Sequence, residues 1–354
     1  MINSKKRVLM AMSGGLDSSV AAMLLQQQGY EVVGISLKFW VDDNSADIDA
    51  FNDAKSLAEQ LEIPYYVFDY TEKFKNIVVQ NFLNEYMCGR TPNPCVLCNV
   101  QLKWCSLMEK AQELNCDYIA TGHYAIVNQQ DNRYFISKGK DAEKDQSYVL
   151  WGLPQEYLAK TIFPLGNYTK KEVREIAQKM GFDAIASKRE SYDVCFIPYN
   201  DYRSFLYRHI PHLSECCLTG NFIDKSGKIV GTHKGYPFYT IGQRKGLVVA
   251  FGTPKYVFNI NAQTNEISLG DKEDLLSNNL IIKKYNLMKY AKIPSNFVGE
   301  TKIRYKDKGQ TSSIEQFDDY IKIQFKEPVS AITPGQSAVI YENSDVVVGG
   351  IISD

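Results

Sequence analysis

The sequence predicts an α/β fold built on a parallel sheet, followed by two smaller β-rich domains, of which the last is a β-barrel. Two observations predict this order. Up to about residue 204, short strand-like runs alternate with helical patterns, and after that point short alternating strands are separated by turn residues. A chain of 354 residues also exceeds what one hydrophobic core usually organises. We therefore expect domains at residues 1–204, 205–275 and 276–354.

The composition is that of a folded protein, with 44% hydrophobic and 23% charged residues. No apolar run approaches the length of a membrane span, and the N-terminus leads directly into a strand pattern, so we expect a cytoplasmic protein without a membrane partner. The eight cysteines are then better explained as thiols, ligands or catalysts than as disulfides. A net charge of −1 argues against a protein that coats nucleic acid by bulk charge.

The elements of the first domain follow from periodicity and turn residues. Strands are expected at 8–12, 32–37, 65–68 and 118–121, and helices at 18–28, 49–61 and 74–87. Residues 88–98 contain glycine and prolines and predict a loop, with a helix from Asn99 to Leu114. Thr169 and Glu172 form a capping box for a helix that ends at Gly181. Later strands are expected at 222–223, 256–260, 321–325, 338–341 and 346–352.

A glycine-rich turn, Ser13-Gly14-Gly15-Leu16-Asp17-Ser18, lies between the first strand and the first helix. Two glycines let backbone N–H groups approach phosphate oxygens, and the helix N-terminus adds a positive dipole. Asp17 can hold the Mg²⁺ that bridges the phosphates. No Gly-Lys-Ser/Thr follows, so this is not a Walker loop. The turn resembles that of the N-type ATP pyrophosphatases (the PP-loop superfamily), which leave AMP on an oxygen of the substrate.

Two cysteines indicate which acceptor receives the AMP. Cys98 directly precedes the helix expected from Asn99, and the dipole of that N-terminus would favour its thiolate. Cys195 stands far along the chain, in Val194-Cys195-Phe196. A pair of thiols combined with adenylation suggests sulfur transfer, in which one thiol carries a persulfide and the other resolves it.

At this point the chain resembles the tRNA-specific 2-thiouridylases. The matching stretches are Ser13 to Ser18, Gly89 to Asn99, Thr121 to Ala125, Lys144 to Tyr148, Cys195 to Ile197, Phe238 to Leu247 and Thr333 to Ser337. The resemblance implies ATP-dependent 2-thiolation of the tRNA wobble uridine. Its C2 oxygen is adenylated and replaced by sulfur from a persulfide, giving 2-thiouridine, AMP and pyrophosphate. It further implies Mg²⁺, the Lys, Glu and Gln isoacceptors of tRNA, and sulfur from a cysteine desulfurase relay.

The resemblance also implies roles for individual residues. Cys98 is the nucleophile and Cys195 carries the persulfide. ATP is held by Ala11, Met12, Ser13, Gly14, Gly15, Leu16, Asp17, Ser18, Leu37 and Gly122. The tRNA is contacted by His123, Lys144, Asp145, Gln146, Arg304, Tyr305 and Gln336, with Asn93, Pro94 and Cys95 near the target base.

Cys95 departs from the family pattern, which has an aspartate there, and this leaves alternatives open. Cys95-x-x-Cys98 with Cys195 would suit a [4Fe-4S] cluster with one open iron site for exogenous sulfide, as in related PP-loop thiolases. A zinc site at Cys88, Cys95, Cys98 and Cys105 is less favoured, because it contains one CxxC only and Cys105 falls within a helical pattern. Rival functions are a non-catalytic tRNA-binding protein and an amide-forming synthetase. Cys216, Cys217 and His212 are interpreted as structural.

Overall fold

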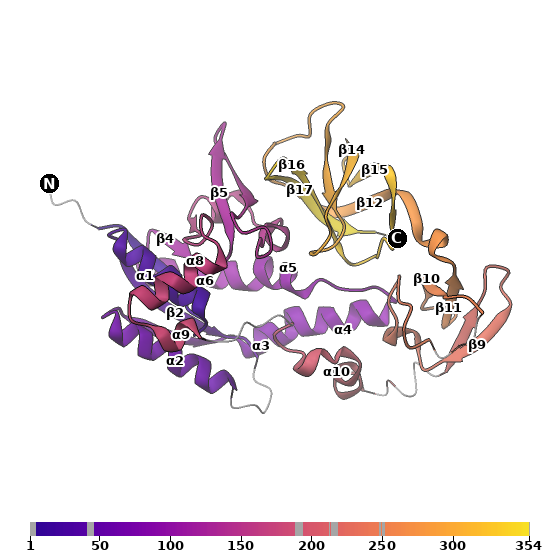
Figure 1. Ribbon diagram of the computed structural model, residues 1–354, viewed down its shortest axis with the longest axis horizontal. Coiled ribbons are helices and arrows are strands. Elements are labelled where there is room, and N and C mark those ends of the chain that lie inside the picture. The colour runs from indigo at the N-terminus through magenta and orange to yellow at the C-terminus, as the bar shows by residue number, and fades with distance from the viewer. Residues whose placement is uncertain are drawn as a thin grey trace.

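The computed structural model describes residues 5–40, 46–187, 194–211, 213, 219–247, 249 and 252–353. Cys216, Cys217 and His212 lie outside these ranges. Figure 1 shows an N-terminal α/β part, a β-rich part near β9–β11 and a β-barrel beside the helix that contains α5. Within the described ranges, every helix is too short or too polar to span a bilayer.

The first sheet is parallel throughout and has the strand order β3-β2-β1-β4-β7. Its strands are β1 (Arg7–Ala11), β2 (Glu31–Lys38), β3 (Tyr65–Asp69), β4 (Tyr118–Ala120) and β7 (Thr161–Ile162). Val8 on β1 is in register with Val32 on β2 and with Tyr118 on β4. The order reverses at β1, and ligands of such sheets bind beyond the carboxyl ends of the strands at this reversal. The glycine-rich turn follows β1 and lies at this point.

Helices cover the sheet in the order that the sequence predicts. They are α1 (Leu16–Gln27), α2 (Ala46–Gln60), α3 (Thr71–Phe74), α4 (Gln80–Met87), α7 (Gln155–Leu158), α8 (Lys170–Lys179) and α9 (Asp183–Ala186), with a π-turn at Lys75–Val79 and a 3-10 turn at Ser147–Leu150. Residues 20–25 of α1 are buried on every side, because this helix packs between the sheet and the α8–α9 pair. The predicted capping box of α8 is present: Thr169 accepts from the Glu172 amide, and Glu172 accepts from the Thr169 amide.

The helix that carries Cys98 begins five residues before the predicted start at Asn99. It consists of α5 (Pro94–Cys98), a π-turn at Asn99–Lys103 and α6 (Trp104–Glu113). The prediction was wrong because it treated Pro94 as a helix breaker. Pro94 occupies the first helical position, where the missing N–H costs nothing and the fixed φ favours the helix. Cys98 therefore lies in the second turn rather than ahead of the helix.

The remaining strands form two further sheets. In the middle part, α10 (Tyr202–His209) precedes a four-stranded sheet of order β10-β11-β8-β9, made of β8 (Gly220–Ile223), β9 (Ile229–His233), β10 (Tyr256–Asn261) and β11 (Glu266–Gly270), with 3-10 turns at Pro198–Asn200, Tyr236–Phe238 and Lys272–Leu275. The last sheet closes into a six-stranded barrel because β12 pairs with both β15 and β17. Its strands are β12 (Leu276–Leu287), β13 (Val298–Lys302), β14 (Gln310–Gln316), β15 (Tyr320–Ser330), β16 (Ser337–Glu342) and β17 (Asp345–Ile352). The predicted barrel is confirmed.

A hairpin of the first domain joins the barrel sheet, and the sequence did not predict it. Its strands are β5 (Ala125–Gln130) and β6 (Arg133–Lys138), and it stands beside the barrel in Figure 1. Ser137 pairs in register with Asp345 of β17 and donates to its carboxylate at 2.5 Å. Lys289 approaches the same carboxylate at 2.6 Å. The barrel is thus fastened to the N-terminal α/β part of the chain.

Candidate active site

The glycine-rich turn has the shape of a phosphate-binding loop. Gly14 has φ +72°, a conformation that glycine adopts without strain, and Gly15 is the N-cap of α1. The turn is held from inside by serine hydroxyls. The Ser13 amide donates to Ser18 Oγ at 3.1 Å, and Ser18 Oγ donates to the Gly15 carbonyl at 3.2 Å. The N-terminus of α1, with its positive dipole, faces whatever fills the turn.

Gly122 is required by a close approach at this turn. It follows β4, next to β1, and a Cβ built on it would lie 2.8 Å from the Ser18 amide nitrogen and 2.9 Å from the Asp17 carbonyl carbon. These neighbours are backbone atoms and cannot rotate away. Leu37, near the carboxyl end of β2, lies on the other side of β1. The residues predicted for ATP therefore gather at the reversal of the sheet, and their contact with ATP stays a prediction.

Asp17 is paired with Lys170, a residue that the sequence did not single out. Lys170 Nζ lies 2.7 and 2.8 Å from the two carboxylate oxygens, and Tyr124 Oη donates to the first at 2.7 Å. Lys170 is the first residue of α8, so the capped N-terminus of α8 places this cation over the start of α1. No motif surrounds Lys170 that would have singled it out.

The three cysteines of interest, Cys95, Cys98 and Cys195, are close enough to interact electrostatically. Burial, with a smaller contribution from the neighbouring cysteines, raises the pKa of Cys98 to about 11 and that of Cys195 to about 12. The pKa of Cys95 is also raised by burial. Cys95 and Cys195 nevertheless expose surface to solvent, so these thiols are crowded by protein but accessible. The expected thiolate at Cys98 is wrong for this state, since burial dominates and Cys98 is not at the helix end.

His123 connects the phosphate loop to the cysteines. It follows Gly122, its Nδ1 is 2.7 Å from Thr121 Oγ1, and its ring lies 5.5 Å from that of Trp104 at the start of α6. Burial lowers the pKa of His123 well below its usual 6.5, and nearby Lys103 lowers it further. The imidazole is therefore neutral near pH 7. It can exchange hydrogen bonds but does not supply positive charge.

Two later domains hold the segment that leads into α5. Gln336 Nε2 donates to the carbonyls of Thr91 at 3.1 Å and Pro92 at 2.8 Å, and the Thr91 amide donates to the Pro334 carbonyl at 3.0 Å. From the middle domain, Tyr236 Oη donates to the Met87 carbonyl at 2.6 Å. The start of the cysteine helix is thus fixed from two directions.

On the barrel side, several residues predicted to contact tRNA converge. Asn93, the N-cap of α5, hydrogen-bonds Tyr148, whose hydroxyl donates to the Ser337 carbonyl at 2.8 Å. The Tyr305 ring lies 6.1 Å from that of Tyr148 and close enough to Cys95 for the two to interact electrostatically. This cluster borders the cysteines on the side of the barrel.

Other residues that are predicted to contact tRNA make hydrogen bonds within the protein. Asp145 accepts from the Gly139 and Ser147 amides, and Gln146 Oε1 accepts from the Tyr124 amide at 3.0 Å. Arg304 Nη2 donates to the Ser330 carbonyl at 2.8 Å. Burial raises the pKa of Tyr305, and the nearby Lys144 opposes this shift. The hydrogen bonds of these residues stabilise the surrounding loops. Their contact with RNA stays a prediction.

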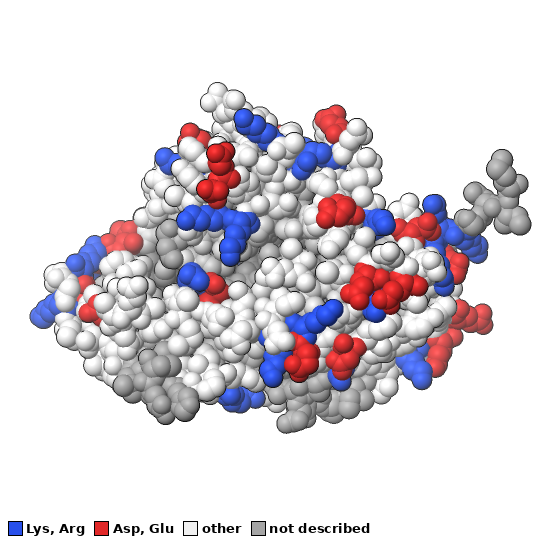
Figure 2. All heavy atoms as spheres, turned by 180° about the vertical axis from the view of Figure 1, so that it is seen from behind, with Lys and Arg blue, Asp and Glu red and all other residues white. Residues whose placement is uncertain are grey.

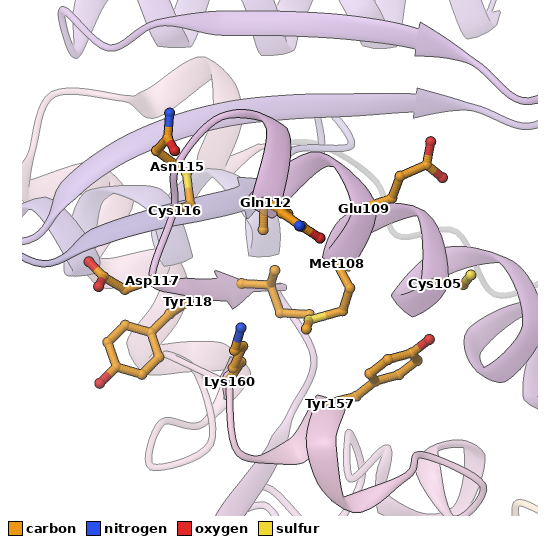
Figure 3. Close-up of a pocket in the computed structure, with 12 residues that line it drawn as sticks. Cys105, Met108, Glu109, Gln112, Asn115, Cys116, Asp117, Tyr118, Tyr157 and Lys160 are labelled. Atoms are coloured by element: carbon orange, nitrogen blue, oxygen red, sulfur yellow. The ribbon is translucent and has the colours of Figure 1, made fainter.

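The cysteines do not form a metal site in this geometry. Among the described residues, no three His, Cys, Asp or Glu side chains are placed to hold a metal ion, so this geometry gives the [4Fe-4S] and zinc hypotheses no support. Cys105 instead faces a separate pocket with Tyr157, Met108 and Lys160, shown in Figure 3. That pocket is lined by the outer face of α6 and does not include Cys98. We derive no step through a cluster.

Charge is mixed over the face of the molecule seen in Figure 2. Basic and acidic side chains are interspersed there, and no single basic sheet covers it. This agrees with the net charge of −1. RNA that contacts this face would therefore meet local basic groups rather than a uniformly basic surface.

Three family models match the chain in succession. They are described as a tRNA methyl transferase HUP domain (residues 6–199), a tRNA methyl transferase PRC-barrel domain (residues 203–271) and an aminomethyltransferase beta-barrel domain (residues 277–352). The first coincides with the parallel sheet and its helices, and the last with the closed barrel.

Full-length relatives carry a different name from these models. A tRNA-specific 2-thiouridylase MnmA of Amoebophilus asiaticus is 47% identical, covering 98% of this chain and 95% of that protein. Proteins of the same name from Cytophaga hutchinsonii and Salinibacter ruber are 46% and 48% identical, covering 99% and 100% of this chain and 98% and 96% of theirs. The chain therefore belongs to the tRNA-specific 2-thiouridylase family.

Proposed function

We propose that this chain is a tRNA-uridine 2-sulfurtransferase of the cytoplasm, which uses ATP to replace the C2 oxygen of the wobble uridine by sulfur. The observation that carries the proposal is the joining of two chemical centres. Gly122 contacts the phosphate loop, and the next residue, His123, leads to the helix that bears Cys98, beside Cys195. The names of the full-length relatives support the same reaction.

In the first half-reaction the substrate oxygen is made into a leaving group. The ATP phosphates lie in the turn from Ser13 to Ser18, with Leu37 and Gly122 beside the nucleotide. Asp17, once released by Lys170, would hold Mg²⁺, and the ion would supply positive charge to neutralise the phosphates. The uridine is extruded from its stack, and its C2 oxygen attacks the α-phosphorus while the bond to pyrophosphate breaks. AMP is then bonded to the C2 oxygen.

In the second half-reaction the two cysteines exchange sulfur for AMP. The terminal sulfur of a Cys195 persulfide attacks C2, the C2–O bond breaks, and AMP leaves with that electron pair. The Cys98 thiolate then attacks Cys195 Sγ. The S–S bond to the outer sulfur breaks, its electron pair stays on the uridine sulfur, and a Cys98–Cys195 disulfide forms. A dithiol reductant resets the disulfide, and a cysteine desulfurase relay reloads Cys195.

Recognition of the tRNA is assigned to the border between α5 and the barrel. Asn93, Pro94 and Cys95 would face the extruded base, while His123, Lys144, Arg304, Tyr305 and Gln336 would contact the surrounding RNA. Because A-form helices offer little sequence information to side chains, shape and phosphate contacts would select the Lys, Glu and Gln isoacceptors.

Pyrophosphate release and 2-thiouridine formation, measured together, test the proposal. Cys98→Ser and Cys195→Ser should lower 2-thiouridine formation about a thousandfold or more while tRNA-dependent pyrophosphate release continues. Cys105→Ser is the matched control, because Cys105 lies on the same helix but faces Tyr157 and should leave both rates unchanged. Full product from both serine variants would refute sulfur transfer.

The same assay separates the rivals. An inert nucleotide loop would release no pyrophosphate, and an amide-forming synthetase would require ammonia. Cys95→Ala should remain active under the two-cysteine scheme. Its inactivity together with iron bound after anaerobic purification would favour the cluster scheme instead.

A further inference from the structure

Lys103 is a cation whose charge acts on the thiol cluster of Cys95, Cys98 and Cys195, and the reaction scheme above does not use it. It ends the π-turn that follows Cys98, and its side chain is half-buried. Within the described ranges it makes no ion pair and no side-chain hydrogen bond. A half-buried ammonium without a carboxylate is costly unless another group uses its charge.

The π-turn explains how Lys103 reaches the cysteines. In an α-helix of 3.6 residues per turn, a residue five positions after Cys98 would point about 140° away from it. The wider turn, with its bond from the Trp104 amide to the Asn99 carbonyl five residues earlier, returns position 103 toward the side of Cys98. π-turns are frequent at functional sites for this kind of displacement.

The turn is locked in place by its neighbours. Asn99 is buried, and its Nδ2 donates to the Val149 carbonyl at 3.0 Å. Val100 packs so closely against Gly152 that a Cβ there would meet its Cγ2 at 2.5 Å. The backbone position of Lys103 relative to Cys98 is therefore fixed by these packing contacts.

The surroundings of Lys103 are thiols and a neutral ring. Its charge acts on Cys95, Cys98 and Cys195, and among the described residues it is the cation that opposes the effect of burial on each. His123 also lies within its reach and is kept neutral. In the same part of the chain, Tyr305 is a further titratable group near Cys95.

We propose that Lys103 is a positioning residue that stabilises the thiolates of Cys98 and Cys195 and so makes them nucleophilic in a crowded, apolar setting. The proposal rests on the proposed function for its purpose, but the charge effect itself requires neither ATP nor tRNA. Its logic is that burial keeps the thiols protonated and protected until reaction, while one fixed cation limits the cost of ionising them.

The test is the rate of alkylation of each thiol by iodoacetamide at pH 8, followed by peptide mass spectrometry in a Cys95→Ala background. At this pH both thiols are mostly protonated, so the rate is proportional to the thiolate fraction. Lys103→Met, which keeps the aliphatic stem, should slow alkylation of Cys98 and Cys195 about tenfold, as expected for a pKa rise of about one unit. Lys103→Arg should stay within about twofold of the parent. Lys171→Met, with a side chain 87% exposed on α8, is the control.

Unchanged alkylation rates in a folded Lys103→Met protein, judged by its melting temperature, would overturn the proposal. So would weaker tRNA binding without a change in alkylation, because Lys103 would then serve the RNA. If Lys103→Met does not fold, the Lys103→Arg protein decides the question. Alkylation about tenfold slower in that protein, although the positive charge is kept, would also refute the inference. The alkylation test contains neither ATP nor tRNA. Its outcome therefore does not depend on whether the thiolation assay supports the proposed function.

Discussion

Lys170 Nζ donates hydrogen bonds to both carboxylate oxygens of Asp17, at 2.7 and 2.8 Å, in the first turn of α1. Only 12% of the Lys170 side chain is exposed, against 35% for Asp17. The pair couples the start of α8 to the phosphate loop. For Asp17 to hold Mg²⁺, its ion pair with Lys170 must break. The Lys170 ammonium could then pair with a phosphate instead.

Lys170→Met should therefore destabilise the protein and weaken its use of ATP. Leaving Asp17 without its cation should lower the free energy of unfolding by about 1–2 kcal/mol, discounted for the partial exposure of the carboxylate. Urea unfolding measures this change. Lys171→Met, one residue along and facing solvent, is the matched control, and equal unfolding curves for both variants would contradict the prediction.

Gly122→Ala should abolish most of the ATP-dependent chemistry. The added Cβ would lie 2.8 Å from the Ser18 amide nitrogen, so the loop or β4 must shift. A displacement of about 1 Å at a reacting centre costs about a hundredfold in rate. Pyrophosphate release checks this, and Gly252→Ala, where nothing lies within 4 Å of the new methyl group, should behave as the parent protein does.

Gln336→Ala should loosen the segment before α5. It removes two hydrogen bonds to the Thr91 and Pro92 carbonyls, worth about 1–2 kcal/mol together. Hydrogen exchange at the amides of residues 89–91 and 93 should become faster. Gln336→Glu should have a larger effect, because a carboxylate would face the two carbonyls. Gln129→Ala, exposed on β5, serves as control. Unchanged exchange in both Gln336 variants would show that these bonds do not hold the segment.

Stability should fall as the pH drops below about 6.5, in part through His123. Its pKa is lowered by burial in the folded protein, so below 6.5 the unfolded chain takes up a proton that the native state does not. The unfolding free energy then decreases with falling pH, by at most about 1.4 kcal/mol per pH unit for one group. His123→Asn should lose less stability between pH 7.5 and 5.5 than the parent. The pKa of His233 is lowered in the same direction and leaves a residual slope. An identical loss in both proteins would disprove the assignment to His123.

The strand, loop and first helix could be predicted from sequence because their signals are local. An apolar run, a glycine-rich turn and Gly29, with φ +88° just beyond α1, fix that unit without help from elsewhere. The capping box at Thr169 is equally local. The helix start at Pro94 failed because a proline has opposite meanings at the first helical position and in the interior.

What the sequence could not give depends on distant partners. The β5–β6 hairpin pairs within itself in a way that turn residues suggest, yet its place in the barrel sheet requires Asp345, more than two hundred positions away. The raised pKa of Cys98 depends on how many atoms surround it in the fold. Lys103 acquires its surroundings only because the helix widens after Cys98, and no residue pattern announced that widening.

The bonds from Gln336 and Pro334 to residues 91 and 92 give the barrel a lever on the chemistry. A displacement of the barrel on binding a macromolecule would reach the first turn of α5 directly, through these hydrogen bonds to the backbone. We therefore expect a large substrate that binds the barrel to influence the position of the helix that bears Cys98. A free uridine, which cannot span the barrel and this helix, would lack that effect.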